Sequence, residues 1–428
     1  MRGLVITLIV LVLAALTVRA VWGYVAARQL RAEIAKIRAA NQPLTFDDLD
    51  AQAPKVDPAD NAARFYMAAM ELVLSFDRQV LEKIKQQEPD KQVIEQAHQI
   101  LTSNHQALEL LDQGAVMAAC QADLGVRRGI GPALNHLGAP RLAARLLSLR
   151  THHLILQGKT QEASDSLIST FKLLRLFERE PVLIVYLVRA SILTLGCGDI
   201  AAVLERADLD DATLTQLQEV LLLADKPEFF ARCILGERVM GMLLMRLVIA
   251  DDTGVSWPKD TPVELSRSFP VHSWSRPMAR QLAIGYLRDM EKLVKASHPP
   301  WPQVFDAMNK IEANSLLGGI LTPSIQNAAR TAGRVTATAR SARVAVMIER
   351  YRLANGKPPT ALGQLVPTYT DALPADPFTG QDLICRSDEQ GYTVYSLGDD
   401  KIDHGGNVIG KEKPTTDWGV HVRIRADR

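Results

Sequence analysis

The chain has 428 residues, of which 47% are hydrophobic and 23% charged, and its net charge is +1. This length predicts two or three domains with sizeable cores. A near-neutral charge without a long basic block argues against nucleic-acid binding through phosphate neutralisation, and an aromatic content of 5% is low for stacking on sugars or bases.

The cysteines do not form a recognisable site. Cys120, Cys197, Cys233 and Cys385 lie far apart in the chain and contain no pair at metal-ligand spacing. A chain of this size does not need a disulfide framework. We therefore expect isolated, buried thiols.

Residues 1–27 are predicted to be a membrane anchor or a signal segment. Leu4 to Val18 is an uninterrupted apolar run, and Trp22 and Tyr24 beyond it suit the interface between lipid and water. As a helix, the stretch from Leu4 to residue 27 would be about 36 Å long, which is enough to span the hydrocarbon core of a bilayer.

Cleavage is the alternative, because Val18-Arg19-Ala20 is a tolerable signal-peptidase site. We favour the anchor, since helical sequence continues to Ala40 without a small-residue loop. Basic residues after the run outnumber Arg2 before it, which by the positive-inside rule favours a cytoplasmic body. They are Arg28, Arg31, Lys36 and Arg38.

The predicted body is α-helical, either a bundle or repeat-like. Residues 28–58 form a helical stem that ends in a proline-rich linker, and residues 59–321 carry helical periodicity. The best helical hairpin spans 141–179, with Gly158 as a helix stop and Thr160 as the next cap. Its turn is similar to that of tetratricopeptide-like helical pairs, but no second copy follows, so a plain antiparallel pair is favoured.

Three other segments bear on the architecture. The apolar stretch 181–204 predicts a buried central helix, with a second membrane span as the alternative. The glycine-rich stretch 125–131 predicts a loop. Residues 251–277 predict a long loop, and a cleft between Trp257 and Trp301 is the place where a hydrolase site is considered, although the chain carries no recognised nucleophile or metal motif.

Residues 322–428 predict a small α+β head. Thr322-Pro323 has the pattern of a helix start, and the helix would run to a glycine stop at Gly356. Residues 382–386 and 391–396 predict two antiparallel strands, and residues 420–424 predict a third.

This region carries several short motifs in a defined order. They are Asn355-Gly356, Asp376-Pro377-Phe378, Tyr395-Ser396-Leu397-Gly398-Asp399-Asp400, and Asp417-Trp418. In order and spacing they resemble the C-terminal half of the major pseudopilin of type II secretion systems. The resemblance implies a head made of a long helix and a short sheet, a body on the periplasmic side of a bacterial cell envelope, and partners in secretion or pilus machinery.

The acidic loop after Leu397 is the candidate metal site. Calcium prefers six to eight oxygen ligands on a loop that can wrap around it, and the spacing here does not match an EF-hand. The pseudopilin resemblance implies Asp400, Asp417 and the Leu397 carbonyl as calcium ligands, and we add Asp403. The alternative is a solvated acidic turn without a metal.

The leading functional hypothesis is a non-enzymatic, membrane-anchored envelope protein that binds or assembles with protein partners through its body and head. The second is a freestanding helical-repeat adaptor in which the head is a stabilising cap. The third is a hydrolase.

Overall fold

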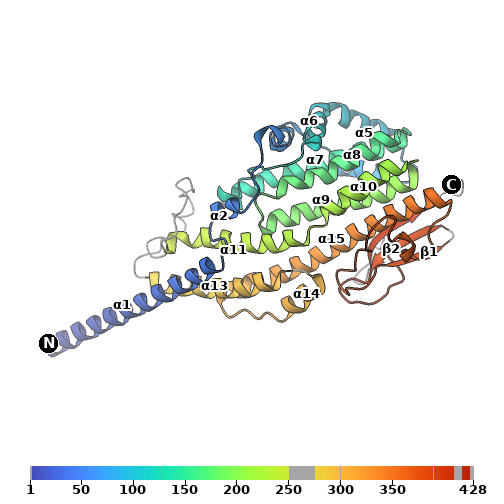
Figure 1. Ribbon diagram of the computed structural model, residues 1–428. Helices are drawn as coiled ribbons and strands as arrows, with labels where there is room; N and C mark the ends of the chain where they lie inside the picture. The colour runs from blue at the N-terminus through green and yellow to red at the C-terminus, as the bar shows by residue number, and fades with distance from the viewer. Residues whose placement is uncertain are drawn as a thin grey trace.

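The computed structural model describes residues 2–128, 130–249, 275–298, 300–388, 390–408 and 417–424. Most of these residues are helical, and a three-stranded antiparallel sheet lies near the C-terminus, in the order β1-β2-β3 (Figure 1). The prediction of a mainly α protein with a small C-terminal sheet is therefore confirmed. The predicted cleft between Trp257 and Trp301 lies largely outside the described residues.

The N-terminal half contains α1 to α8. Their bounds are α1 Arg2–Ala39, α2 Phe46–Ala51, α3 Ala63–Leu72, α4 Arg78–Ile84, α5 Lys91–Ser103, α6 His105–Val116, α7 Ile130–Leu156 and α8 Thr160–Leu173. The C-terminal half contains α9 Leu183–Arg206, α10 Asp211–Ala224, α11 Pro227–Ile249, α13 Arg276–Ala296, α14 Trp301–Asn309, α15 Leu316–Asn355, β1 Ile384–Asp388, β2 Gly391–Ser396 and β3 Trp418–Arg423. Short 3-10 helices lie at Pro58–Asp60, Val126–Arg128, Leu174–Phe177 and Leu362–Leu365.

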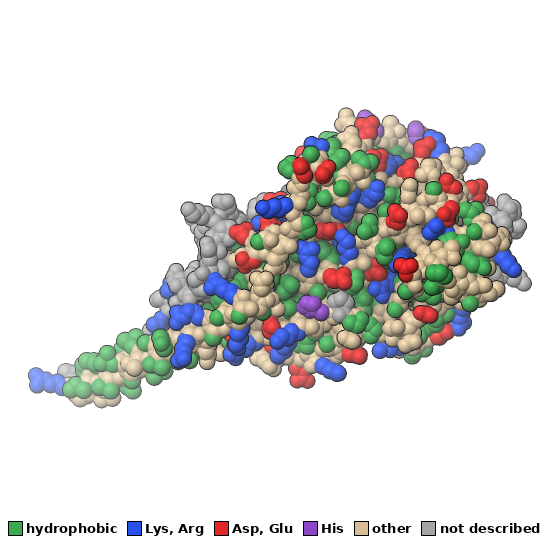
Figure 2. All heavy atoms as spheres, viewed as in Figure 1, with side chains coloured by type: hydrophobic (Ala, Val, Ile, Leu, Met, Phe, Trp, Pro, Cys, Tyr) green, Lys and Arg blue, Asp and Glu red, His purple; other side chains and the backbone are tan. Residues whose placement is uncertain are grey.

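The helix α1 projects from the body. Its large apolar side chains are exposed from Leu4 to Val25, whereas Leu30, Ile34 and Ile37 are buried against the body, where α1 packs on α13. Hydrophobic side chains cover the projecting part, and Lys and Arg side chains gather where it meets the body (Figure 2). The sheet lies at the opposite end of the molecule from the exposed end of α1 (Figure 1).

Two described helices, α1 and α9, are long and apolar enough to cross a membrane by length and composition alone. They differ in burial, since none of the most apolar window of α1 is buried and 61% of that of α9 is. The helix α9 packs on α7, α8, α11 and α15. The expectation of a buried central helix is therefore confirmed.

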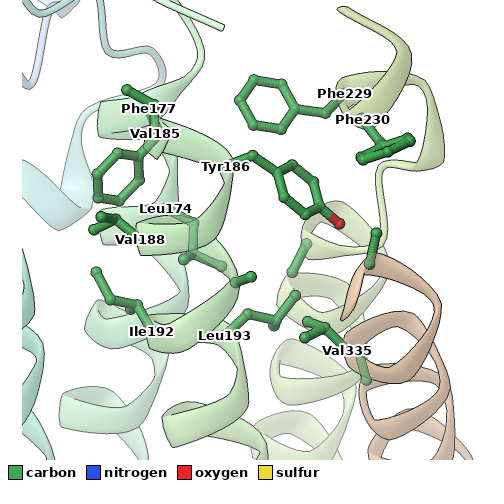
Figure 3. Close-up of a cluster of buried hydrophobic side chains, with 14 of the residues drawn as sticks. Leu174, Phe177, Val185, Tyr186, Val188, Ile192, Leu193, Phe229, Phe230 and Val335 are labelled. Atoms are coloured by element: carbon green, nitrogen blue, oxygen red, sulfur yellow. The ribbon is translucent and has the colours of Figure 1, made fainter. Parts of the chain in front are cut away.

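A row of contacting aromatic side chains connects the body to the head. Tyr186 of α9 lies against Phe229 and Phe230 of α11, in a cluster that also receives Val335 of α15 (Figure 3). The Phe230 ring is 5.5 Å from that of Trp301. Trp301 stacks on Phe305 at 5.6 Å, and Phe305 stacks on Phe378 of the head at 4.8 Å. Body and head therefore share one hydrophobic core.

Side-chain caps define several helix starts. Asp77, Asp90 and Asp210 each accept a backbone N–H of the following turn, which satisfies a donor that the helix leaves unpaired. The predicted hairpin is present as α7 and α8, and Gly158 between them has a φ of 72°. Thr160, predicted as the cap, is instead the first residue of α8, and Lys159 at the cap position makes no side-chain cap.

The predicted start of the long helix at Thr322 was wrong. The helix α15 begins after Ser315, whose hydroxyl accepts the Gly318 N–H at 3.0 Å, and Pro323 lies inside the helix. The carboxylate of Asp289 accepts the Ser315 hydroxyl at 2.6 Å and so holds this cap in place. The predicted end of the helix at Gly356 is confirmed, with a φ of 72°.

Two further local predictions need correction. The glycine-rich stretch 125–131 is not a loop throughout, because residues 126–128 form a 3-10 turn and α7 already begins at Ile130. The linker predicted before residue 58 contains α2, which is capped by Thr45. The strand β2 matches its predicted bounds, whereas β1 and β3 are each offset by one or two residues.

Candidate functional site

The predicted metal-ligand residues lie on one loop at the end of β2. The Leu397 N–H donates to Asp376, and Asp400 and Asp403 follow it in the turn. Asp417 lies immediately before β3 and is buried. The structure therefore places all four residues at the same edge of the head, where β2 ends and β3 begins.

Protein donors already bind each of the three carboxylates. The Asp400 carboxylate lies 2.9 Å from Nε2 of His404, and this hydrogen bond lowers the pKa of Asp400. Asp403 accepts the Gly405 N–H at 2.8 Å, which lowers the pKa of Asp403, and it also accepts the Tyr395 hydroxyl at 2.9 Å. Asp417 accepts the Gly406 N–H at 2.8 Å.

Gly405 and Gly406 aim their N–H groups at these carboxylates. Both have a φ of 80°, a conformation that glycine adopts at little cost. Within the described residues, no group of three or more His, Cys, Asp or Glu side chains is arranged to hold a metal ion. An ionised carboxylate has about four acceptor sites, so calcium would compete with these hydrogen bonds only where it takes the same lone pair.

A calcium titration tests the loop as a metal site. If calcium binds there, replacing Asp400 by alanine should lower the melting temperature more in millimolar calcium than in chelator, because in chelator the variant loses only the hydrogen bonds with His404 and the Ile402 N–H. The measurement is thermal unfolding of parent and variant, with the exposed Asp371→Ala as a control. Equal melting temperatures of parent and Asp400→Ala in both conditions would contradict the hypothesis that calcium binds at this loop.

Asp376 is the buried centre of the head. Its carboxylate accepts the Phe378 N–H at 2.7 Å, the Ser396 hydroxyl at 2.9 Å and the Leu397 N–H at 3.1 Å. It therefore connects the Asp-Pro-Phe turn to the end of β2. The sequence identified this motif only through the resemblance and gave Asp376 no role.

A groove lies between the loop and the long helix, and we call it the head groove. It is lined by Asn309, Asn327, Arg330, Thr331, Arg334, Asp399 and Asp400. The Arg334 guanidinium pairs with Asp399 and lies 5.0 Å from the centre of the Trp418 ring. An ion pair and an aromatic ring therefore hold one wall of the groove in position.

A second cluster of ionisable groups lies inside the helical body. Asp199 of α9 accepts Lys85 Nζ at 2.8 Å and lies 2.9 Å from Nε2 of His152. Burial alone would raise the pKa of Asp199, but the Lys85 charge and the His152 hydrogen bond outweigh it and lower the pKa to about 2. This cluster is a structural network, and the sequence did not predict it because Lys85 and Asp199 are 114 positions apart.

The cluster should make stability depend on acid. Because the folded pKa of Asp199 is about 2 and the ordinary value is 3.8, its contribution is complete above about pH 4 and is lost as the pH falls towards 2. Asp199→Asn should therefore cost about 2 kcal/mol of unfolding free energy at pH 6, and less below pH 4. Urea unfolding of parent and variant across this pH range measures the difference. The exposed Asp165→Asn is the control, and a pH-independent difference would contradict the assignment.

Comparisons with protein-family models, with curated proteins and with solved structures find no match for this chain. The pseudopilin resemblance therefore rests on the motifs of the sequence.

Proposed function

We propose that this protein is a non-enzymatic, membrane-anchored component of the bacterial cell envelope that binds protein partners through its distal head. Its body lies on the periplasmic side, and the partners belong to secretion or pilus machinery, as the motifs of the head imply. The observation that carries the proposal is the unbroken passage of α1 from an exposed apolar segment into the packed body.

The junction between α1 and the body supports an anchor that holds the body in a set orientation. Nη1 of Arg280 in α13 donates to the Gly23 carbonyl at 3.0 Å. Arg288 of α13 pairs with Glu33 of α1 at 2.8 Å. The exposed part before Gly23 contains 21 residues counted from Arg2, about 32 Å of helix, which matches the hydrocarbon core of a bilayer.

The head groove supports binding of partners at the distal end. It combines cationic, anionic and amide side chains on a helix and a braced loop, so it can recognise a polar protein surface with specific charge pairs. Arg330 is exposed on its rim.

One observation favours the second candidate, a helical adaptor with the head as a stabilising cap. The sheet packs on the body itself, since β3 contacts α9 and α15. Arg350 of α15 pairs with Asp211 of α10 at 2.8 Å, and Gln218 donates to the Tyr369 carbonyl at 2.7 Å. In this alternative the body carries the partner site.

Deleting residues 2–20 tests the anchor. The buried residues of α1 begin at Gly23, so the deletion should release the protein from the membrane fraction without lowering its melting temperature. The measurements are membrane fractionation and thermal unfolding of parent and deletion variant. A parent protein that already fractionates as soluble, with a mature N-terminus near residue 21, would show that the segment is a cleaved signal and would contradict the anchor.

Affinity purification tests the partner site. Full-length protein, Arg330→Glu and the control Arg78→Glu on α4 are purified from native membranes in mild detergent, and co-eluting proteins are identified by mass spectrometry. Secretion or pilus components that elute with parent and control but not with Arg330→Glu support the head groove. Elution with all three favours the helical adaptor, and recovery of no such component contradicts the proposal.

A further inference from the structure

A pocket of about 340 Å³ lies in the helical body, apart from the head groove. We call it the basic pocket. Its lining comes from the ends of α8 and α10, the start of α11, Arg189 of α9 and the segments that follow α2 and α6. The volume is within the range of small-molecule sites. Its apolar wall consists of Pro54, Val56, Phe171, Leu174, Val220 and Leu223.

The charged part of the lining is strongly basic. It contains Glu178 and six cations, namely Lys172, Arg175, Arg179, Arg189, Lys226 and Arg232. Four of the cations have defined contacts in the fold: Lys226 pairs with Glu178 at 2.6 Å, and Arg179 pairs with Asp50 at 3.3 Å. Arg175 donates to the carbonyls that end α6, and Nη2 of Arg232 donates to the Glu178 carbonyl at 3.4 Å. In the described part of the chain, Lys172, Arg189 and Arg232 form no ion pair with a carboxylate.

Arg189 is the most deeply placed of these cations. Its side chain belongs to a residue that is only 4% exposed, and its Nη2 donates to the Ala224 carbonyl at 2.7 Å. Its Nε is buried and has no hydrogen-bond partner. The guanidinium also lies 5.2 Å from the centre of the Phe229 ring. Glu178 and Asp225 act on Arg189 without an ion pair to it. A buried guanidinium without a paired carboxylate loses solvation that a carbonyl and a ring only partly replace.

Lys172 is a second cation of the pocket without an ion pair in the described residues, although the Asp165 carboxylate acts on it from a distance. Burial lowers the pKa of Lys172, and repulsion from Arg175 lowers it further. An anion in the pocket would offset both effects, because an opposite charge nearby favours the protonated, charged form of the lysine. Beside these cations stands Leu223, a large apolar side chain that is 66% exposed. The pocket therefore offers unbalanced positive charge and an uncovered apolar surface to the same ligand.

We propose that the basic pocket binds a small amphiphile with an anionic head group, a carboxylate or a phosphate on an apolar chain. The head group pairs with Arg189, Lys172 and Arg232, and the chain lies on Leu174, Val220 and Leu223. A free inorganic anion would use the charge and leave the apolar wall exposed. This inference does not depend on the function proposed for the head.

Calorimetric titration of the full-length protein in lipid particles tests the pocket, with empty particles as the blank. The probes are decanoate, decyl phosphate, 1-decanol and inorganic phosphate. We expect saturable binding of decanoate or decyl phosphate, with no saturable binding of decanol and weaker binding of inorganic phosphate. The stronger of the two amphiphiles identifies the head group.

The deciding variant is the double substitution Lys172→Gln with Arg232→Gln, because both side chains are only partly buried and neither forms an ion pair in the described residues. Thermal unfolding of the variant checks that it folds as the parent does. It should weaken amphiphile binding about tenfold or more, since two charge-assisted contacts are lost. Lys159→Gln, which precedes α8 outside the pocket, should bind as the parent does. Arg189→Gln is a second variant if it melts at the temperature of the parent. Unchanged binding in the double variant, no saturable amphiphile binding, or equal binding of inorganic phosphate would overturn the proposal.

Discussion

Replacing Asp376 by alanine should lower the free energy of unfolding by about 3 kcal/mol, because three backbone N–H groups and one hydroxyl lose their acceptor at a largely buried site. The carboxylate is 2% exposed, and its donors come from two separate segments, the turn at Phe378 and the end of β2. The loss should therefore detach the loop that carries Asp400 from the rest of the head.

Urea unfolding of the full-length protein in mild detergent measures this effect. The matched control is Asp382→Ala, an exposed carboxylate in the same region of the head, and we expect it to change stability by less than about 0.5 kcal/mol. A similar small change for Asp376→Ala would mean that solvent replaces the carboxylate, and that the head does not depend on it.

Gly236→Ala should be as damaging, at about 3 kcal/mol, although it adds a single methyl group. Gly236 lies in α11 where this helix meets the chain just before α9. A Cβ atom at this position would overlap the carbonyl oxygen of Pro181 and would lie 3.3 Å from the Val182 side chain. Since the obstacle is backbone, the two helices would have to separate.

Gly198→Ala is the matched control, and we expect it to stabilise the protein and not to destabilise it. It lies in α9, is exposed, and a Cβ atom there would meet nothing within 4 Å. Alanine in place of glycine inside a helix should stabilise the protein by up to about 1 kcal/mol. Thermal unfolding of the two variants compares them directly, and a Gly236→Ala protein that melts with the parent would contradict the close approach of α11 to Pro181.

Local sequence patterns predicted the elements whose boundaries are set locally. Gly158 and Gly356 end helices because each adopts a positive φ, and this is visible in the sequence as a glycine after an apolar stripe. The strand β2 could be placed to the residue, since a polar turn precedes Gly391 and alternating side chains follow it.

Tertiary contacts decided the remaining elements, and the sequence alone could not predict them. The start of α15 at Ser315 depends on Asp289 in α13, whereas the Thr322-Pro323 pair is an equally good local start. The basic pocket draws its lining from segments between residues 53 and 232, so its charge appears only after folding. From the sequence alone, its arginines and lysines would be assigned to the solvent-exposed faces of separate amphipathic helices.

If α1 anchors the chain in a membrane, its continuity with the body has a geometric consequence. An α-helix turns once every 3.6 residues, so inserting or deleting one residue between the exposed and the packed segment would rotate the body by about 100° about the helix axis. In an anchored chain, the face of α1 that touches lipid or a neighbouring span is therefore in fixed register with the face of the body that looks along the membrane. The orientation of the head, which lies at the far end of the 40-residue helix α15, would then be fixed as well.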